Sequence, residues 1–386
     1  NSIGLRWFCI MYMNFWYAAE ESENITNEPA KVHMLGQDFV LFRDTGGKVH
    51  CLSNLCVHRG ASLAHGKVKG DNIECPYHGW QFKGKDGVCT KIPSLGPDAK
   101  IPSRAKVDSY PTEERYGLVF AFLGDLPESE RPPIIDIPEW DQDGWRFTLM
   151  RYTWEANYQR ALENSLDPAH TEFVHPAMGY QGDRDDYKVP DLEVTASEWG
   201  VGTMTIFQSP DLPHEKMKGI KGEGQMEAGT TMCGISQAVT KLHFSPVAWA
   251  HQYTFTTPVD EHHTARFFLQ GRIFRTDPEM DAPVNERNLI VADQDKVVIE
   301  RLEPFHTPES STEEVLVKSD LVITRFRELL ADWEARGWKI DSDSVDQFRE
   351  HKAHSVPSPA RRTVKSWAIN AVPTCVPKQT TRVAAE

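Results

Sequence analysis

Residues 51–80 read CLSNLCVHRGASLAHGKVKGDNIECPYHGW. This stretch holds two short clusters of metal-binding residue types, each with one Cys and one His, which we call knots. The first knot pairs Cys56 with His58, and the second pairs Cys75 with His78. Thiolates and imidazoles from two loops hold either zinc or a [2Fe–2S] cluster in which two Cys bind one iron and two His bind the other. Because each knot supplies one Cys and one His, each iron of a cluster would receive one ligand from each loop, which favours the cluster.

The length of 386 residues predicts two domains, because single domains seldom exceed about 250 residues. Short alternating apolar runs between residues 32 and 123, broken by turn signals, indicate an all-β first unit. Four prolines between residues 127 and 138 predict an exposed connector. We therefore place the domain boundary near residue 145 and expect domains 1–145 and 146–386.

The second domain has a mixed pattern of helical and strand-like segments. We expect a helix over residues 154–166, mostly strands over 192–275, and a long helix over 312–336 that begins with a capping box of Ser311 and Glu314. Apolar side chains between residues 195 and 290 could line a substrate pocket; they are Met204, Phe207, Met226, Met232, Trp249, Phe255 and Phe268.

Charge and cysteine usage exclude several classes of partner. The net charge is −14 and the 42 Lys and Arg are scattered, so we expect neither a nucleic acid nor a membrane surface as partner. The aromatic segment 7–17 is about half the length of a spanning helix and contains Asn14, which favours a core segment. Seven widely spread cysteines fit a reducing cytoplasm better than a disulfide framework.

The flanks of the two knots, CVHRGASLAHG and CPYHGWQFKGKDG, resemble the two cluster-binding loops of Rieske proteins. The resemblance implies that Cys56 and Cys75 hold the inner iron, and that His58 and His78 hold the outer, more exposed iron. Structural zinc is the alternative, and it would leave the protein colourless. The other cysteines near the knots, at 51 and 89, are expected in the core.

Residues 163–175 read ENSLDPAHTEFVH, and the string N-x-x-D-x-x-H-x4-H is similar to the mononuclear iron motif of Rieske non-haem iron oxygenases. Asn164, Asp167, His170 and His175 occupy its four places. Two imidazoles and one carboxylate on one face of Fe(II) leave positions open for O₂ and substrate. Because positions i and i+5 lie about 140° apart on a regular helix, we expect a break near Asp167, which is followed by proline.

The third iron ligand is expected downstream, where the family usually supplies an Asp on a helix. Residues 289–302, LIVADQDKVVIERL, offer Asp295 and, as a rival, Asp293. Asp295 shares a helix face with the apolar residues three, four and seven positions after it, whereas Asp293 points about 200° away from Asp295. We therefore favour Asp295.

The resemblance also implies a fold and an assembly. The fold class is α+β: an N-terminal all-β Rieske domain followed by a helix-grip catalytic domain, in which an antiparallel sheet curves around a long helix. In such oxygenases an Asp at the place of Asp167 links a cluster His of one copy to an iron-binding His of the next. Here Asp167 would connect His78 of a neighbouring copy to His170, which requires a head-to-tail ring, most simply a homotrimer.

The reaction class follows from the same resemblance. A separate NAD(P)H-dependent reductase, a ferredoxin or both would supply electrons, in agreement with the absence of a G-x-G-x-x-G string from the sequence. The opening NFWYAAE and the short Rieske region resemble vanillate and dicamba O-demethylases, so we expect hydroxylation or oxidative demethylation of a small organic, preferably aromatic, substrate by O₂. Ring cis-dihydroxylation is the alternative reaction. A Rieske electron carrier or redox sensor is the non-enzymatic alternative.

Overall fold

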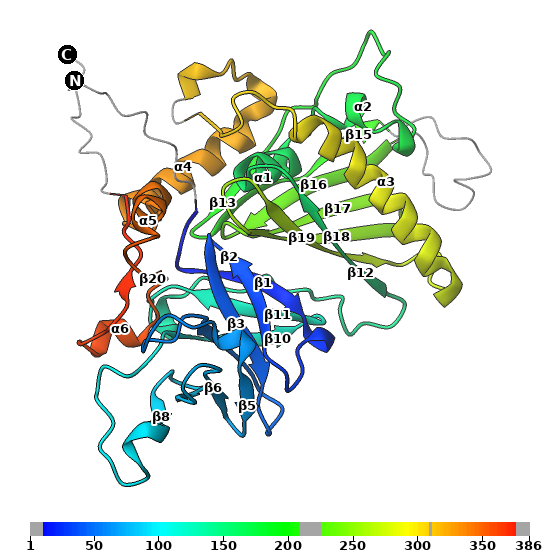
Figure 1. Cartoon of the computed structure of the whole chain (residues 1–386). Helices are drawn as coiled ribbons and strands as arrows, with labels where there is room; N and C mark the ends of the chain where they lie inside the picture. Colours follow the sequence, from blue (N-terminus) through cyan, green and yellow to red (C-terminus); the bar gives the residue numbers. More distant parts are fainter. Residues whose placement is uncertain (1–10, 209–224, 309–310, 376–386) are drawn as a thin grey trace, which may run out of the picture. The chain divides into compact units, whose positions relative to one another are not determined.

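A computed structural model describes residues 11–208, 225–308 and 311–375 (Figure 1). The chain divides into two compact units. The first consists of Asn1–Arg131 together with Glu328–Glu386, and the second is Pro132–Arg327.

These units differ from the predicted domains 1–145 and 146–386 at two places. The connector after Arg131 packs with the second unit, where the Ile135 N–H donates to the side chain of Gln237 at 2.8 Å. Alternate connector residues are buried, so the expectation of a fully exposed connector was wrong. The C-terminal residues return to the first unit, where the hydroxyl of Tyr12 donates to the carbonyl of Leu330 at 3.3 Å.

The N-terminal part of the first unit, up to Arg131, is built from three small antiparallel sheets, which confirms the all-β prediction made for residues 32–123. Their strand orders are β1-β11-β10, β2-β3-β4-β9 and β5-β6-β7-β8. The strands are β1 Phe15–Glu21, β2 Ala30–Met34, β3 Gln37–Arg43, β4 Val49–Ser53, β5 Lys67–Lys69, β6 Asn72–Glu74, β7 Gln81–Lys83, β8 Cys89–Lys91, β9 Ser109–Tyr110, β10 Thr112–Arg115 and β11 Leu118–Leu123. Cys51 and Cys89 are buried in this unit, as expected.

The aromatic segment near the start of the chain forms part of the core. Residues 11–17 are all buried, while residues 7–10 of the same segment lie outside the described residues. No helix in the described part of the chain is both long and apolar enough to cross a membrane.

The C-terminal helix begins later than predicted. Helix α4 spans Leu321–Ala335, and short 3₁₀ turns precede it in place of the expected first turns. Glu314 does not cap a helix, because its carboxylate accepts hydrogen bonds from Arg160 at 2.8 Å and from Arg327 at 2.7 Å. The remaining C-terminal elements are α5 Ser342–Phe348, β20 His354–Ser355, α6 Ala360–Thr363 and β21 Asn370–Ala371.

The second unit contains one eight-stranded antiparallel sheet, which confirms the strands expected over 192–275. The strand order is β12-β19-β18-β17-β16-β14-β13, and β15 also pairs with β16. The strands are β12 Arg146–Trp154, β13 Val194–Ser197, β14 Gly200–Thr203, β15 Thr205–Gln208, β16 Gln225–Cys233, β17 Gln237–Ser245, β18 Ala248–Pro258 and β19 Thr264–Arg272.

Helices α1 Tyr158–Leu166 and α3 Asp281–Ile299 lie against this sheet, and the short helix α2 Thr171–Val174 contacts α3 (Figure 1). These three helices carry the candidate site. Helix α1 starts four residues later than predicted because Trp154 is the last residue of β12 and Asn157 caps the helix, accepting from the Gln159 N–H at 3.0 Å. Helix α3 is the longest described helix, and its packing across the antiparallel sheet confirms the predicted helix-grip architecture.

The start of α3 is fixed to the sheet by a charged cluster. Asp281, the first residue of α3, accepts from Arg146 of β12 and from the fully buried Arg272 of β19. The hydrogen bond from Arg146 and a second from Arg272 lower the pKa of Asp281 to about 2, although burial acts to raise it. A carboxylate at a helix N-terminus is also stabilised by the helix dipole.

We expect Asp281→Asn to lower the free energy of unfolding by about 3 kcal/mol, because it leaves the buried Arg272 without a charged partner. Since the folded pKa lies below the unfolded value of about 3.9, this contribution is complete above that value and is lost as the pH falls toward 2. Urea unfolding should therefore give the same deficit at pH 5 and pH 8. The exposed Asp277 provides the control Asp277→Asn, and a deficit that changes between pH 5 and pH 8 would assign the effect to another group.

Candidate active site

The two Cys–His knots form a pair of similar loops in the first unit. The Gly60 N–H donates to the carbonyl of Cys56 at 2.9 Å, and the Gly79 N–H donates to that of Cys75 at 3.0 Å. Both glycines have positive φ angles, 74° and 69°, which favour glycine because it has no Cβ. Cys56 and Cys75 are buried, whereas the two histidines of the knots are exposed.

The chemistry of these loops fits a [2Fe–2S] cluster. Burial raises the pKa of the Cys56 thiol to about 12, and the neighbouring Cys75 adds to this effect. Such thiols lose their protons only when a metal takes the protons' place. The imidazole rings of His58 and His78 lie 4.5 Å apart, and the His58 ring stacks on Trp80 at 4.5 Å. Buried thiols and exposed imidazoles suit an inner and an outer iron.

The second group of candidate ligands, His170 and His175, lies at a break between two helices. Helix α1 ends at Leu166, and the short α2 begins at Thr171, so the predicted break is present. The carboxylate of Asp167 accepts from the Ala169 N–H at 2.7 Å and stabilises the turn between the helices. His170 and His175 flank α2 on either side, which directs both imidazoles to one point.

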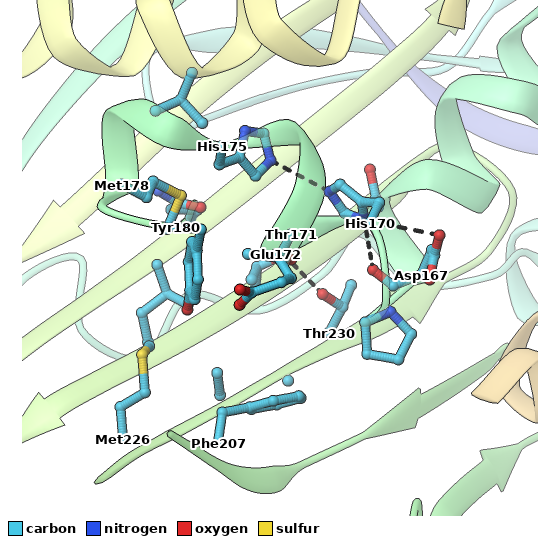
Figure 2. Close-up of a pocket in the computed structure, with 18 of the residues that line it drawn as sticks. Asp167, His170, Thr171, Glu172, His175, Met178, Tyr180, Phe207, Met226 and Thr230 are labelled. Carbon is cyan, nitrogen blue, oxygen red and sulfur yellow. Dashed lines mark hydrogen bonds and ion pairs between the residues drawn. The ribbon is translucent and has the colours of Figure 1, made fainter. Parts of the chain in front are cut away.

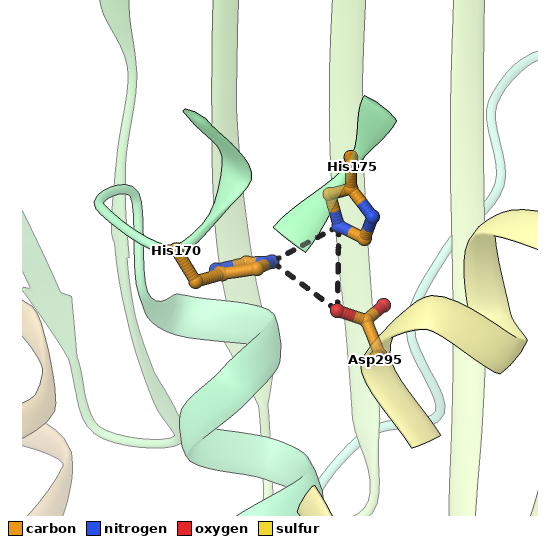
Figure 3. A group of neighbouring side chains, drawn as sticks. All are labelled: His170, His175 and Asp295. Carbon is orange, nitrogen blue, oxygen red and sulfur yellow. Dashed lines mark hydrogen bonds and ion pairs between the residues drawn. The ribbon is translucent and has the colours of Figure 1, made fainter. Parts of the chain in front are cut away.

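Figure 3 shows how His170 and His175 meet Asp295, which projects from α3. The Nε2 atoms of the two histidines lie 3.3 Å apart. Oδ1 of Asp295 lies 3.5 Å from Nε2 of His170 and 3.3 Å from Nε2 of His175. These three atoms are the ones that could hold a metal ion on one face.

The hydrogen bonds behind the two imidazoles fix their tautomers. Nδ1 of His170 lies 2.7 Å from the backbone carbonyl oxygen of Asp167, and Nδ1 of His175 lies 3.3 Å from Oε1 of Gln294. Since both oxygens are acceptors, each Nδ1 donates a proton and each Nε2 presents a lone pair. The triangle therefore consists of three acceptors without a donor among them, and a bound cation removes their mutual repulsion.

Asp295 rather than Asp293 has the position that a ligand needs. Only 14% of the Asp295 side chain is exposed. Its Oδ1 is buried and accepts no hydrogen bond from the described residues, which fits an atom reserved for a metal ion. Asp293, two residues earlier on the same helix, is exposed.

Two side chains that support the site, Gln294 and Glu172, were not predicted from the sequence. Gln294 orients His175. In the sequence, only the position of Gln294 next to Asp295 could have pointed to this role. Glu172 lies between the two histidines, is buried, and accepts two hydrogen bonds from Arg184 at 3.1 and 2.6 Å. Arg184 also donates to Gln208 of β15 at 2.7 Å. This contact fixes α2, and with it both histidines, to the following loop and the sheet.

A cavity of about 440 Å³ opens beside the three acceptor atoms, and His170, His175 and Asp295 all line it. In Figure 2, Phe207 and Met226 lie on one side of the cavity and the two histidines on the other. Of the apolar residues expected to line a pocket, Phe207, Met226 and Phe268 do so; Met204, Met232, Trp249 and Phe255 are not part of the lining. A volume of this size suits a small organic molecule.

An all-β unit with Cys–His knots and a helix-grip unit with a His–His–Asp site define an oxygenase that combines a cluster with a catalytic iron. Residues 15–111 match the family described as Rieske [2Fe-2S] domain, and residues 154–336 match the Vanillate O-demethylase oxygenase C-terminal domain. The chain therefore belongs to the Rieske non-haem iron oxygenases, as an oxygenase component carrying a [2Fe–2S] cluster and a mononuclear iron.

Similar proteins cover most of the chain. The iron–sulfur subunit of the toluene-4-sulfonate monooxygenase system from Comamonas testosteroni is 28% identical over 82% of this chain and 95% of its own length. The structure of Pseudomonas putida NdmA with caffeine is 26% identical, with a TM-score of 0.70 over 84% of this chain and 91% of its own. Dicamba monooxygenase bound to dicamba shares the fold, with a TM-score of 0.70 and 23% identity over 85% of this chain and 99% of its own.

Proposed function

We propose that the chain hydroxylates or oxidatively demethylates a small organic substrate in the cavity beside His170, His175 and Asp295. The observation that carries this proposal is the triangle of three acceptor atoms that lines the cavity, because it leaves one side of a bound metal ion open to substrate. The similar proteins include a toluene-4-sulfonate monooxygenase and a methylxanthine N1-demethylase, which supports small organic substrates as a class.

We assign the roles as follows. Cys56, Cys75, His58 and His78 hold the cluster, and His170, His175 and Asp295 hold the iron. When bound, the cluster supplies single electrons and the iron supplies the site of O₂ activation. Gln294 and the carbonyl of Asp167 keep both Nε2 lone pairs aimed at the iron. The carboxylate of Asp167 accepts a hydrogen bond from His78 of a neighbouring copy and so connects the two centres.

This assignment implies partners and an assembly. A separate NAD(P)H-dependent reductase, with or without a ferredoxin, delivers the electrons. A head-to-tail homotrimer brings the cluster domain of one copy to the iron of the next. We place the protein in the cytoplasm, where thiols stay reduced; this agrees with six free cysteines among the described residues.

Metal analysis of anaerobically purified protein tests the proposal. We expect three irons and two acid-labile sulfides per chain, together with the visible spectrum of a Rieske cluster. Two irons and two sulfides, unchanged after Fe(II) is added, would favour an electron carrier instead. A colourless protein that contains zinc would exclude the cluster.

A product assay with a reductase then distinguishes the reactions. Incorporation of one oxygen atom from ¹⁸O₂ into a hydroxylated product, or release of formaldehyde from a methyl ether or N-methyl compound, supports monooxygenation. A cis-diol containing two labelled oxygen atoms would support the alternative reaction, ring dihydroxylation.

A further inference from the structure

A row of neutral polar side chains crosses the floor of the cavity. Thr230 of β16 is paired with Thr240 of β17, Thr240 with Gln252 of β18, and Gln252 with Gln270 of β19. Directly opposite residues in antiparallel strands point to the same face of the sheet. All four residues line the cavity, so the register alone places hydroxyl and amide groups side by side across four strands.

Most members of this polar row have partners of their own. The hydroxyls of Thr230 and Thr240 bond each other at 2.8 Å. The amide oxygen of Gln270 accepts a hydrogen bond from the side chain of Asn288 on α3. Thr230 and Gln270 are buried, and Thr240 and Gln252 are half-buried.

Gln252 differs from the rest of the row. Among the described residues, none makes a hydrogen bond with its side-chain amide, and that amide lines the cavity. The apolar residues Leu242 and Phe268 line the cavity on either side of the row. Gln252 therefore offers one donor group and one acceptor group between apolar walls.

No member of the polar row is charged, and the cationic side chains that line the cavity lie outside the row. Arg184 is bound to Glu172, and the buried Arg266 lies over the Trp154 ring and donates to Ser165 at 2.9 Å. Lys188 also lines the cavity but is exposed to solvent, where an ion pair contributes little. Arg287 lines the cavity from α3; the residue as a whole is exposed, but burial of its guanidinium lowers its pKa. Arg266 lies four residues before Gln270 on β19, about 13 Å along the strand from the row. A carboxylate or sulfonate bound by the row itself would thus be desolvated without a cation in contact with it.

We infer that the substrate is a neutral molecule with an apolar body and an amide-like edge, a carbonyl next to an N–H group, and that Gln252 binds this edge through both of its polar groups. Gln252 is a specificity-determining residue that discriminates against carboxylates and against hydrocarbons of the same shape. A site built to hydrogen-bond a ligand rejects an analogue that lacks the group, because the polar groups of the site are then left unpaired.

Three probes of nearly equal shape test this inference: 4-methoxybenzamide, 4-methoxytoluene and 4-methoxybenzoate. Calorimetry on the iron-loaded protein without reductant measures their binding in the absence of turnover. We expect the benzamide to bind about 10-fold more tightly than either other probe, the effect of one to two net hydrogen bonds. Gln252→Leu should remove this preference, and Gln252→Glu, which keeps the acceptors and adds a negative charge, should weaken the benzoate further.

A pair of neighbouring threonines gives a matched control. Thr230 belongs to the polar row, whereas Thr231 points to the opposite face of the sheet and is exposed. Thr230→Val should weaken the benzamide because it disturbs the row, and Thr231→Val should leave all three affinities unchanged. The cluster spectrum and the melting temperature of each variant show whether it is folded. Tightest binding of the benzoate, equal affinities for the three probes, or an unchanged order in folded Gln252→Leu overturns the inference.

The inference rests on the proposed function only in taking this cavity as the substrate site. Binding that prefers the benzamide without any O₂-dependent product would retain the inference and overturn the proposed reaction. Demethylation with a preference for the benzoate would do the reverse. The two proposals can therefore fail separately.

Discussion

Asp295→Ala should remove one iron from each chain while leaving two irons, two sulfides and the cluster spectrum intact. Asp295 supplies one of three acceptor atoms that lie 3.3 to 3.5 Å apart, and two imidazoles alone bind Fe(II) poorly. Mutating groups that only support a ligand typically costs 10- to 100-fold in metal affinity or activity, so we expect the loss of the ligand itself to cost more than about 100-fold in both. The cluster should persist because its four ligands belong to the other compact unit.

Asp293→Ala is the matched control for this experiment. The two aspartates lie two residues apart on α3, but Asp293 is exposed and lies outside the triangle. We expect Asp293→Ala to keep three irons and normal turnover. Loss of iron from Asp293→Ala, with retention in Asp295→Ala, would exchange the roles of the two residues. Iron analysis and the reduced-cluster spectrum decide between these results without knowledge of the substrate.

The sequence predicted the parts of the site that are local in the chain. The two knots and the segment 163–175 each hold candidate ligands within a few residues, so their spacing together with the family resemblance predicted Cys56, His58, Cys75 and His78, as well as His170 and His175. The choice of Asp295 over Asp293 needed only the phase of one helix, and the structure places the half-buried Asp295 beside the two histidines.

Features that depend on long-range pairing could not be predicted in this way. The polar row joins residues 230, 240, 252 and 270, and only the register of four strands brings them together. The connector after Arg131 was expected to be exposed because prolines exclude regular structure, but they do not prevent alternate residues from packing on a neighbouring sheet. Helix α4 starts late because Glu314 binds Arg160, which lies 154 residues away in sequence, as well as Arg327 of the helix itself.

Asp167→Asn should leave both metal centres in place and lower turnover by about 100-fold or more. His170 donates to the backbone carbonyl of Asp167, which the substitution keeps, and the Asp167 carboxylate lies 3.9 Å from Nδ1 of His170. An asparagine oxygen can still accept from the Ala169 N–H, so the turn between α1 and α2 should persist. The substitution therefore removes a negative charge and little else.

The measurement combines iron content, the cluster spectrum and the rate at which the reduced cluster is reoxidised in the presence of substrate and O₂. Asp186 lines the same cavity and is exposed, so Asp186→Asn controls for the loss of a carboxylate near the site. Loss of iron from Asp167→Asn would show a structural role at the iron site. Normal turnover with three irons would show that the carboxylate is dispensable.

Mixed assemblies test whether the connection made by Asp167 runs between copies of the chain. A chain with Asp167→Asn keeps an intact cluster domain, and a chain with Cys56→Ser loses the cluster but keeps Asp167. Each should be inactive alone. If Asp167 accepts from His78 of a neighbouring copy, assemblies formed from both chains should recover part of the wild-type activity, because some junctions pair an intact cluster domain with an intact Asp167. If the connection lies within one chain, no junction is complete and the mixture stays inactive.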